Sequence, residues 1–242
     1  MAALCLNAVL PKTAVADVAS ATVPRVVLLA ARTNRAMMRG VVVNERHITV
    51  AIAAGPVHYG ERNDALVMMQ AGAFTRLQYL TIVKNGRPLS ARDIAAQERI
   101  DNAKLVRGHG FFKQPFDRTY LRDYSYHAAP CTCSANQRAI AFVSRVRDSQ
   151  HGDGSMLIDS STGRVLNITY TPNVLPKYAS TATTTESFGE PMPGLWCIVR
   201  IDRTYSGHVA FFGGHGRVTE ALDHFSRPGS VNAAFALLGA AR

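Results

Sequence analysis

The sequence predicts a mainly β protein of the α+β class, in which two main helices pack on a single curved antiparallel sheet. Three observations support this prediction. Segments in which apolar and polar residues alternate recur between residues 41 and 225. Turns rich in glycine, asparagine and serine separate several of these segments, as in β-hairpins. Helical spacing appears in two main stretches, and the regular strand–helix alternation of a parallel sheet is missing from the sequence.

The first helix is expected over residues 26–38. Pro24 stands early in its first turn, where a backbone N–H would have no helical partner in any case. Gly40 marks the expected end of the helix. The residues that recur at the spacing of one helical face are Val26, Leu29, Ala30, Thr33 and Met37.

Strands and a second helix follow in the next seventy residues. A strand is expected over residues 41–52, with a break at Asn44-Glu45, and two more over 65–70 and 76–83. Asn85 and Gly86 then give a strong turn signal. Ser90 and Asp93 have the spacing of a capping box, which predicts a helix over residues 91–106. Its apolar stripe is thin, so we expect it to lie on the surface.

Hairpins dominate the second half of the chain. Residues 138–147 alternate, and this predicts opposite faces for Phe142 and for the pair Arg145 and Arg147. Residues 155–159 and 164–171 should pair through the turn at 160–163. Two further turns are expected, at Ser206-Gly207 and at Gly213–Gly216. After Pro228 the chain is expected to form a short helix or a frayed tail.

The composition fits a single globular domain. The chain has 242 residues, of which 47% are hydrophobic and 18% charged, so it can bury a substantial core. No stretch of the sequence is apolar for long enough to predict a spanning helix. We expect one β-rich domain over residues 17–228, followed by a tail over 229–242.

The first sixteen residues are expected to be a truncated signal segment. Residues 2–10 are mostly apolar, and Ala14-Val15-Ala16 before Asp17 fits a cleavage site of the A-x-A type. A positively charged start is missing. These features predict a bacterial protein that is exported to the periplasm or secreted.

The net charge of +10 and the pI of about 9.8 favour anionic partners. The same charge is equally typical of a protein that is basic only for solubility. The arginines are scattered singly, without a basic run or the aromatic-plus-basic pattern of single-strand binders. Nucleic acid is therefore not an expected partner.

The sequence contains no recognisable catalytic motif, and we expect neither an enzyme nor a cofactor or metal site. The G-x-S-x-G nucleophile elbow is absent. His109, His151 and His215 each stand beside glycine, which places them in turns or at the surface. Cys131 and Cys133 are too close in sequence for an ordinary structural disulfide. With His127 nearby, they leave open the alternative of a hydrolase that uses histidine or cysteine.

One hairpin carries a resemblance to a known family. Residues 153–166, with Ile158-Asp159 and Thr162-Gly163 around the turn, resemble a hairpin of LolA-like proteins. This superfamily comprises periplasmic lipoprotein carriers and envelope-stress regulators. Residues 74–90 and Gly110–Asp117 resemble segments of uncharacterised bacterial secreted proteins of similar type. The resemblance implies an unclosed half-barrel sheet with helices in its concave face, where the carriers hold acyl chains.

Together these observations predict an exported LolA-like binding protein for a lipid, a lipoprotein or another apolar envelope ligand. The alternative is an envelope sensor domain that binds a partner protein. Large aromatic residues on the strands are candidates for lining a ligand cavity, although they could equally fill an ordinary core: Phe142, Tyr170, Trp196 and Phe211. Arginines that interrupt apolar strands are candidates for anionic head groups, or are simply a solvated face: Arg145, Arg147, Arg200 and Arg203.

Overall fold

The computed structural model describes residues 23–240 except 71, 107–111, 176 and 210–211. The expected signal segment and Cys5 lie outside these residues. In the described part of the chain, no helix has the length and apolar character needed to cross a membrane.

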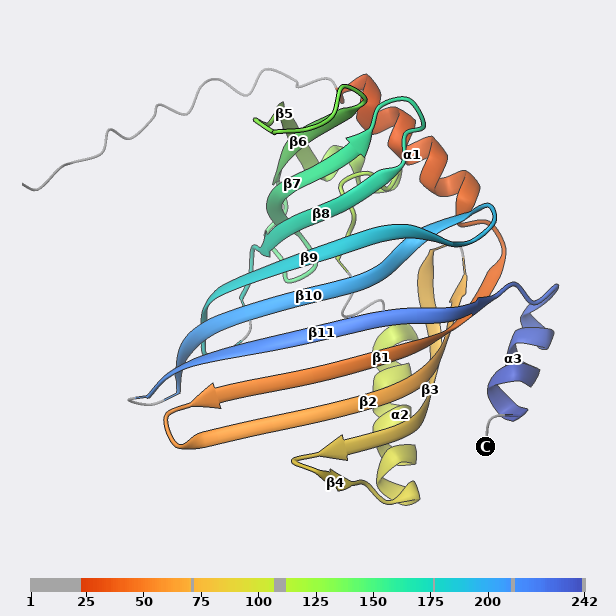
Figure 1. The fold of residues 1–242 in the computed structure, drawn as a ribbon, viewed down its shortest axis with the longest axis vertical. Coiled ribbons are helices and arrows are strands. Elements are labelled where there is room, and N and C mark those ends of the chain that lie inside the picture. The colour runs from red at the N-terminus through yellow and green to blue at the C-terminus, as the bar shows by residue number, and fades with distance from the viewer. Residues whose placement is uncertain (1–22, 71, 107–111, 176, 210–211, 241–242) are drawn as a thin grey trace, which may run out of the picture.

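Eleven strands form one unclosed antiparallel sheet, in the order β4-β3-β2-β1-β11-β10-β9-β8-β7-β6-β5. Their bounds are β1 Val41–Ala54, β2 Val57–Gln70, β3 Ala73–Lys84, β4 Arg87–Pro88, β5 Tyr124–Ala128, β6 Gln137–Ser144, β7 Gly152–Asp159, β8 Val165–Pro172, β9 Ala179–Met192, β10 Leu195–Val209 and β11 Phe212–Ser226. Figure 1 shows the strands in this order, from β5 at the top to β4 at the bottom. The predicted fold class is confirmed.

Helix α1, Arg25–Met37, covers the β7–β10 region of the sheet (Figure 1). It buries Val27, Ala30 and Ala31 in one cluster with Met156 and Ile158 of β7. Thr33 of α1 also donates a hydrogen bond to the carbonyl of Thr162, 2.9 Å away, in the turn between β7 and β8. The helix therefore rests on the hairpin that the family resemblance singled out.

Helix α2, Ala91–Val106, protects the open edge of the sheet. The predicted cap is present, since the backbone N–H of Asp93 donates to the Ser90 hydroxyl at 3.2 Å. Asn102 bonds to both the N–H and the carbonyl of Leu77 on β3, at 2.9 and 2.8 Å. These edge groups would otherwise offer a pairing site to another strand.

Helix α3, Val231–Ala240, forms in the tail segment, for which a short helix was one of the two predicted alternatives. Its Ala234 and Leu238 pack on Val41 and Val43 of β1 and on Met68 of β2. Val42, between these two valines, belongs instead to the cluster around β1–β3, which also contains residues of β10. Alternation along β1 therefore separates two faces: an outer face that carries α3, and an inner face that carries Val42.

Two predicted turns are wrong, because residues 206–207 and 213–216 lie within strands. Strand β10 continues to Val209 and β11 begins at Phe212, with Gly207 paired to Gly214. A Cβ atom on Gly207 would lie 1.9 Å from the Tyr178 carbonyl oxygen. The glycine thus permits close approach of a neighbouring chain segment, which local sequence cannot distinguish from a turn. The break predicted at Asn44-Glu45 is a register shift within one continuous strand β1.

The docking of α1 on the β7–β8 turn can be tested at Gly163. Its φ is +72°, and a Cβ atom there would lie 2.7 Å from Leu29 Cγ of α1. Gly194 also has a φ of +72°, but nothing lies within 4 Å of its Cβ position. We expect Gly194→Ala to lower the free energy of unfolding by about 1 kcal/mol, the cost of left-handed backbone.

Gly163→Ala should cost more than Gly194→Ala, because it adds a clash with α1 to the same backbone strain. Urea unfolding of the two variants measures the difference. Equal losses for the two substitutions would contradict the contact between α1 and the turn.

Candidate functional site

A cavity of about 820 Å³ lies against the inner face of the sheet. Asn34 of α1 and Met38, which directly follows the helix, contribute to its lining, as do residues of the segment 112–120. Strands β1–β3 and β8–β10 supply the polar and apolar residues on the sheet side. The volume falls within the range of roughly 300–1,000 Å³ that is typical of small-molecule sites.

Much of the cavity wall is apolar. Met69 and Phe74 come from β2 and β3, and Ile198 and Ile201 come from β10. Phe116 and Phe188 also line the cavity and meet edge to face, with their ring centroids 5.7 Å apart. These side chains offer a surface that an apolar ligand could cover.

His151 holds the segment 112–120 in place. It is 1% exposed, and its Nδ1 and Nε2 lie 2.8 and 3.2 Å from carboxylate oxygens of Asp148 and Asp123. The backbone N–H of Lys113 donates to the Gln150 carbonyl at 2.8 Å. These contacts join the cavity wall to the loop before β7. His151 directly follows a turn at residues 149–150, but the predicted alternative of a surface position is wrong, because the side chain is buried.

Three charged side chains meet on the inner face of neighbouring strands. Glu220 of β11 is buried between Arg46 of β1 and Arg203 of β10, and both guanidinium groups donate hydrogen bonds to its carboxylate. Burial alone would raise the pKa of Glu220, but the charges of Arg46 and Arg203 and their hydrogen bonds hold it below its ordinary value. Both arginines line the cavity.

Glu186 of β9 lies beside this cluster, but its pKa is shifted in the opposite direction to that of Glu220. Burial raises its pKa above the ordinary value, against the opposing effect of hydrogen bonds from Gln114 and Tyr170 and the charge of Arg203. The Tyr170 hydroxyl donates to Glu186 at 3.1 Å. Gln114, which lines the cavity, has a buried Oε1 atom without a hydrogen-bond partner in the described part of the chain. The cavity thus has a polar region as well as apolar walls.

The aromatic residues predicted from the sequence occupy different places. Tyr170 lines the cavity and stacks on Phe112, with the ring centroids 3.5 Å apart. Phe142 is buried in the adjoining core. Trp196 donates its indole N–H to the Val165 carbonyl at 2.7 Å and is not among the residues that line the cavity. Phe211 lies outside the described residues.

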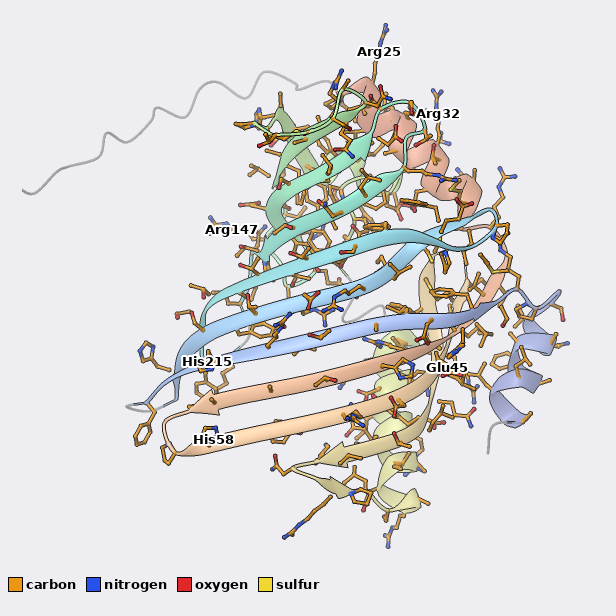
Figure 2. The ribbon with its side chains drawn as sticks, viewed as in Figure 1. Arg25, Arg32, Glu45, His58, Arg147 and His215 are labelled. Atoms are coloured by element: carbon orange, nitrogen blue, oxygen red, sulfur yellow. A yellow bond between two sulfur atoms is a disulfide. The ribbon has the colours of Figure 1, made fainter. Side chains whose placement is uncertain are left out.

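Of the four predicted arginines, the structure places Arg203 at the cavity. Arg200 is exposed and pairs with Asp202, at 2.6 and 3.0 Å. Arg145 and Arg147 are exposed and follow β6, which ends at Ser144. Figure 2 shows Arg147 extending outward, as Arg25 and Arg32 do from α1. Arg46, Glu186 and Glu220 were not selected from the sequence. Other charged residues share their strands, such as Glu45, Glu190 and Asp223, and no local pattern distinguishes the first three from these.

The cysteines give little support to nucleophilic catalysis. Cys131 and Cys133 are joined as a disulfide, with Cα atoms 5.2 Å apart, so their close spacing in the sequence does not prevent a bridge. This Cα separation lies within the usual range for disulfides, about 4.4–6.8 Å. Cys197 is buried, and burial raises the pKa of its thiol to about 12.

Within the described residues, Glu45, His47 and Asp223 form a group that could hold a metal ion, with candidate ligand atoms within 4.8 Å of one another. Asp64 lies 2.7 Å from the other ring nitrogen of His47. These are also the contacts of a protonated imidazole among carboxylates. The hydrogen bond with Asp64 raises the pKa of His47, burial opposes it, and Asp223 raises it further.

The sequence matches no protein-family model, and comparison with the curated proteins gives no match. The chain is similar to a LolA superfamily protein from Nitrosomonas europaea, with a TM-score of 0.36 and 10% identity over 89% of this chain and 98% of that one. It is similar to a DUF1329 family protein from Desulfovibrio piger, with a TM-score of 0.38 and 9% identity over 92% of this chain and 100% of that one. It is also similar to a putative outer membrane lipoprotein-sorting protein domain from Vibrio parahaemolyticus, with a TM-score of 0.39 and 11% identity over 89% of this chain and 98% of that one. These three solved structures include the superfamily that the β7–β8 hairpin resembles. TM-scores this low support no argument about function.

The His47 cluster predicts how stability changes with pH. Because the folded pKa lies above the ordinary value of 6.5, protonated His47 contributes stability that is fully present below that value. The contribution is lost as the pH rises through the folded pKa. We therefore expect His47→Gln to lower the free energy of unfolding more at about pH 6 than at about pH 8.5.

His58→Gln is the matched control, because His58 is exposed on the adjacent strand β2. Denaturant unfolding at the two pH values compares both variants with the original protein. A deficit for His47→Gln that stays constant or grows with pH would contradict the assignment.

Proposed function

We propose that this protein binds a ligand with a long apolar chain in the inner-face cavity, as a carrier or binding protein for a lipid or lipoprotein. The observation that carries the proposal is the cavity of about 820 Å³ between the sheet, α1 and the segment 112–120. Its apolar walls provide the driving force, since each buried CH₂ group contributes about 0.8 kcal/mol.

The arrangement of the walls supports an elongated occupant. Phe74, Met69 and Met38 belong with the cluster around β1–β3, whereas Phe116 lies in the cluster under α1. The cavity contacts both clusters. A flexible chain that lies along the inner face would therefore contact apolar side chains from both parts of the sheet. Methionine suits such a surface because its side chain adapts to different shapes.

Export belongs to the same proposal. A protein that carries envelope lipids would work outside the cytoplasm, and residues 1–16 supply the expected signal segment. The mature binding unit would then begin near Asp17 and include α3, which packs on β1 and β2. The hydrolase alternative has less support, because Cys131 and Cys133 are paired and Cys197 is a buried thiol of raised pKa. Binding of an envelope protein is the outcome left if no acyl ligand enters the cavity.

Filling the cavity should weaken ligand binding strongly. Ile198 lines the cavity from β10, so Ile198→Trp adds bulk where the chain would lie. We expect this variant to bind a fluorescent acyl probe at least about tenfold more weakly than the original protein. Native mass spectrometry of the purified protein should also show copurified lipid lost from the variant.

Val199→Trp is the control, because Val199 is the next residue on β10, is also partly buried and does not line the cavity. It should keep its affinity for the probe. Thermal unfolding of both variants checks that they remain folded. Undiminished binding by Ile198→Trp, or no probe binding by the original protein, would overturn the proposal.

A further inference from the structure

The cavity contains an unbalanced positive charge, and this feature narrows the ligand class. Arg46 and Arg203 share one carboxylate, that of Glu220. Glu186, the other buried acid beside them, has no hydrogen bond to either arginine in the described part of the chain. Its carboxylate accepts from the Gln114 amide and, at 3.1 Å, from the Tyr170 hydroxyl, and burial raises its pKa. Two guanidinium groups and one carboxylate leave one positive charge in excess.

The excess charge lies inside the cavity and not on the outer surface of the protein. The side chains of Arg46 and Arg203 are 17% and 25% exposed, and that of Glu220 is 2% exposed. Arg145, Arg147 and Arg200 are exposed and do not line the cavity. An anionic group that seeks a cation at this site must therefore enter the cavity.

Both arginines retain hydrogen-bonding capacity for such a group. A guanidinium carries five N–H donors. Within the described residues, Arg46 gives Nε and one terminal nitrogen to Glu220, and Arg203 gives one terminal nitrogen. The remaining N–H groups match the paired oxygens of a carboxylate.

Apolar groups stand directly beside the charged cluster. The guanidinium of Arg46 lies 5.4 Å from the centre of the Phe74 ring. Ile201 precedes Arg203 by two positions on β10 and lines the same cavity. The chain of a ligand whose head group binds the arginines would therefore contact apolar side chains directly beside them.

We infer that the cavity takes a single-chain amphiphile with one terminal oxyanion, a long-chain fatty acid, whose carboxylate binds between Arg46 and Arg203. This inference rests on the proposed function and deepens it. A monoanion balances the one excess positive charge. The Glu220 carboxylate orients both guanidinium groups and is thus a positioning residue for the head group.

The test compares hexadecanoate with its uncharged methyl ester, by displacement of a fluorescent acyl probe from the full chain. We expect the original protein to prefer the acid by at least about tenfold, since only the acid forms charge-assisted hydrogen bonds. Arg203→Gln removes the excess charge and should reduce the preference to about twofold or less. Arg200→Gln, on the same strand but outside the cavity, should leave it unchanged.

A double variant distinguishes loss of the excess charge from damage to the fold as the cause of a reduced preference. Arg203→Gln with Glu220→Gln restores the excess of one positive charge on Arg46, so part of the preference should return. Acetate, which lacks the chain, should not displace the probe. Equal affinity for acid and ester in the original protein would overturn this inference and leave the proposed function standing. If neither compound displaces the probe, the proposed function fails as well.

Discussion

The antiparallel pairing of β1 with β11 joins the two parts of the sheet, β1–β4 and β5–β11, into one surface. Its register runs from Val43 opposite Ser226 to Ala54 opposite Gly214. On one side lie β2, β3 and β4, and on the other lie β10 to β5. Without this pairing, the chain would form two smaller sheets, and neither would cover the other's open edge. The cavity depends on the same pairing, because its sheet side draws on both parts.

The charged cluster sits across this junction, and stability alone is a poor explanation for it. Glu220 and Arg46 come from the paired strands, and Arg203 comes from the next strand, β10. A buried Arg–Glu–Arg group contributes little to stability, because its desolvation offsets the attraction between the charges, and apolar residues of similar size often stabilise a core more. Its place at the wall of a cavity agrees better with a role in ligand binding.

The opposite wall is held by a different kind of interaction. The segment 112–120 has no regular secondary structure except turns, so its backbone bonds must come from elsewhere. The Tyr126 hydroxyl donates to the Pro115 carbonyl at 2.6 Å, and Lys113 bonds to Gln150. His151, bonded on both sides to carboxylates, fixes the loop that makes these contacts. The cavity can remain partly unfilled because polar contacts outside it, and packing under α1, hold its walls apart.

Local patterns in the sequence determined the antiparallel sheet, the two main helices, the Ser90 cap and the β7–β8 hairpin, because alternation and capping depend on residues close together along the chain. Cross-strand contacts decided the rest. Arg200 and Arg203 look alike in the sequence, yet the register of β10 places only Arg203 at the cavity. Arg46 and Glu220 are 174 residues apart, so only the pairing of β1 with β11 could bring them together.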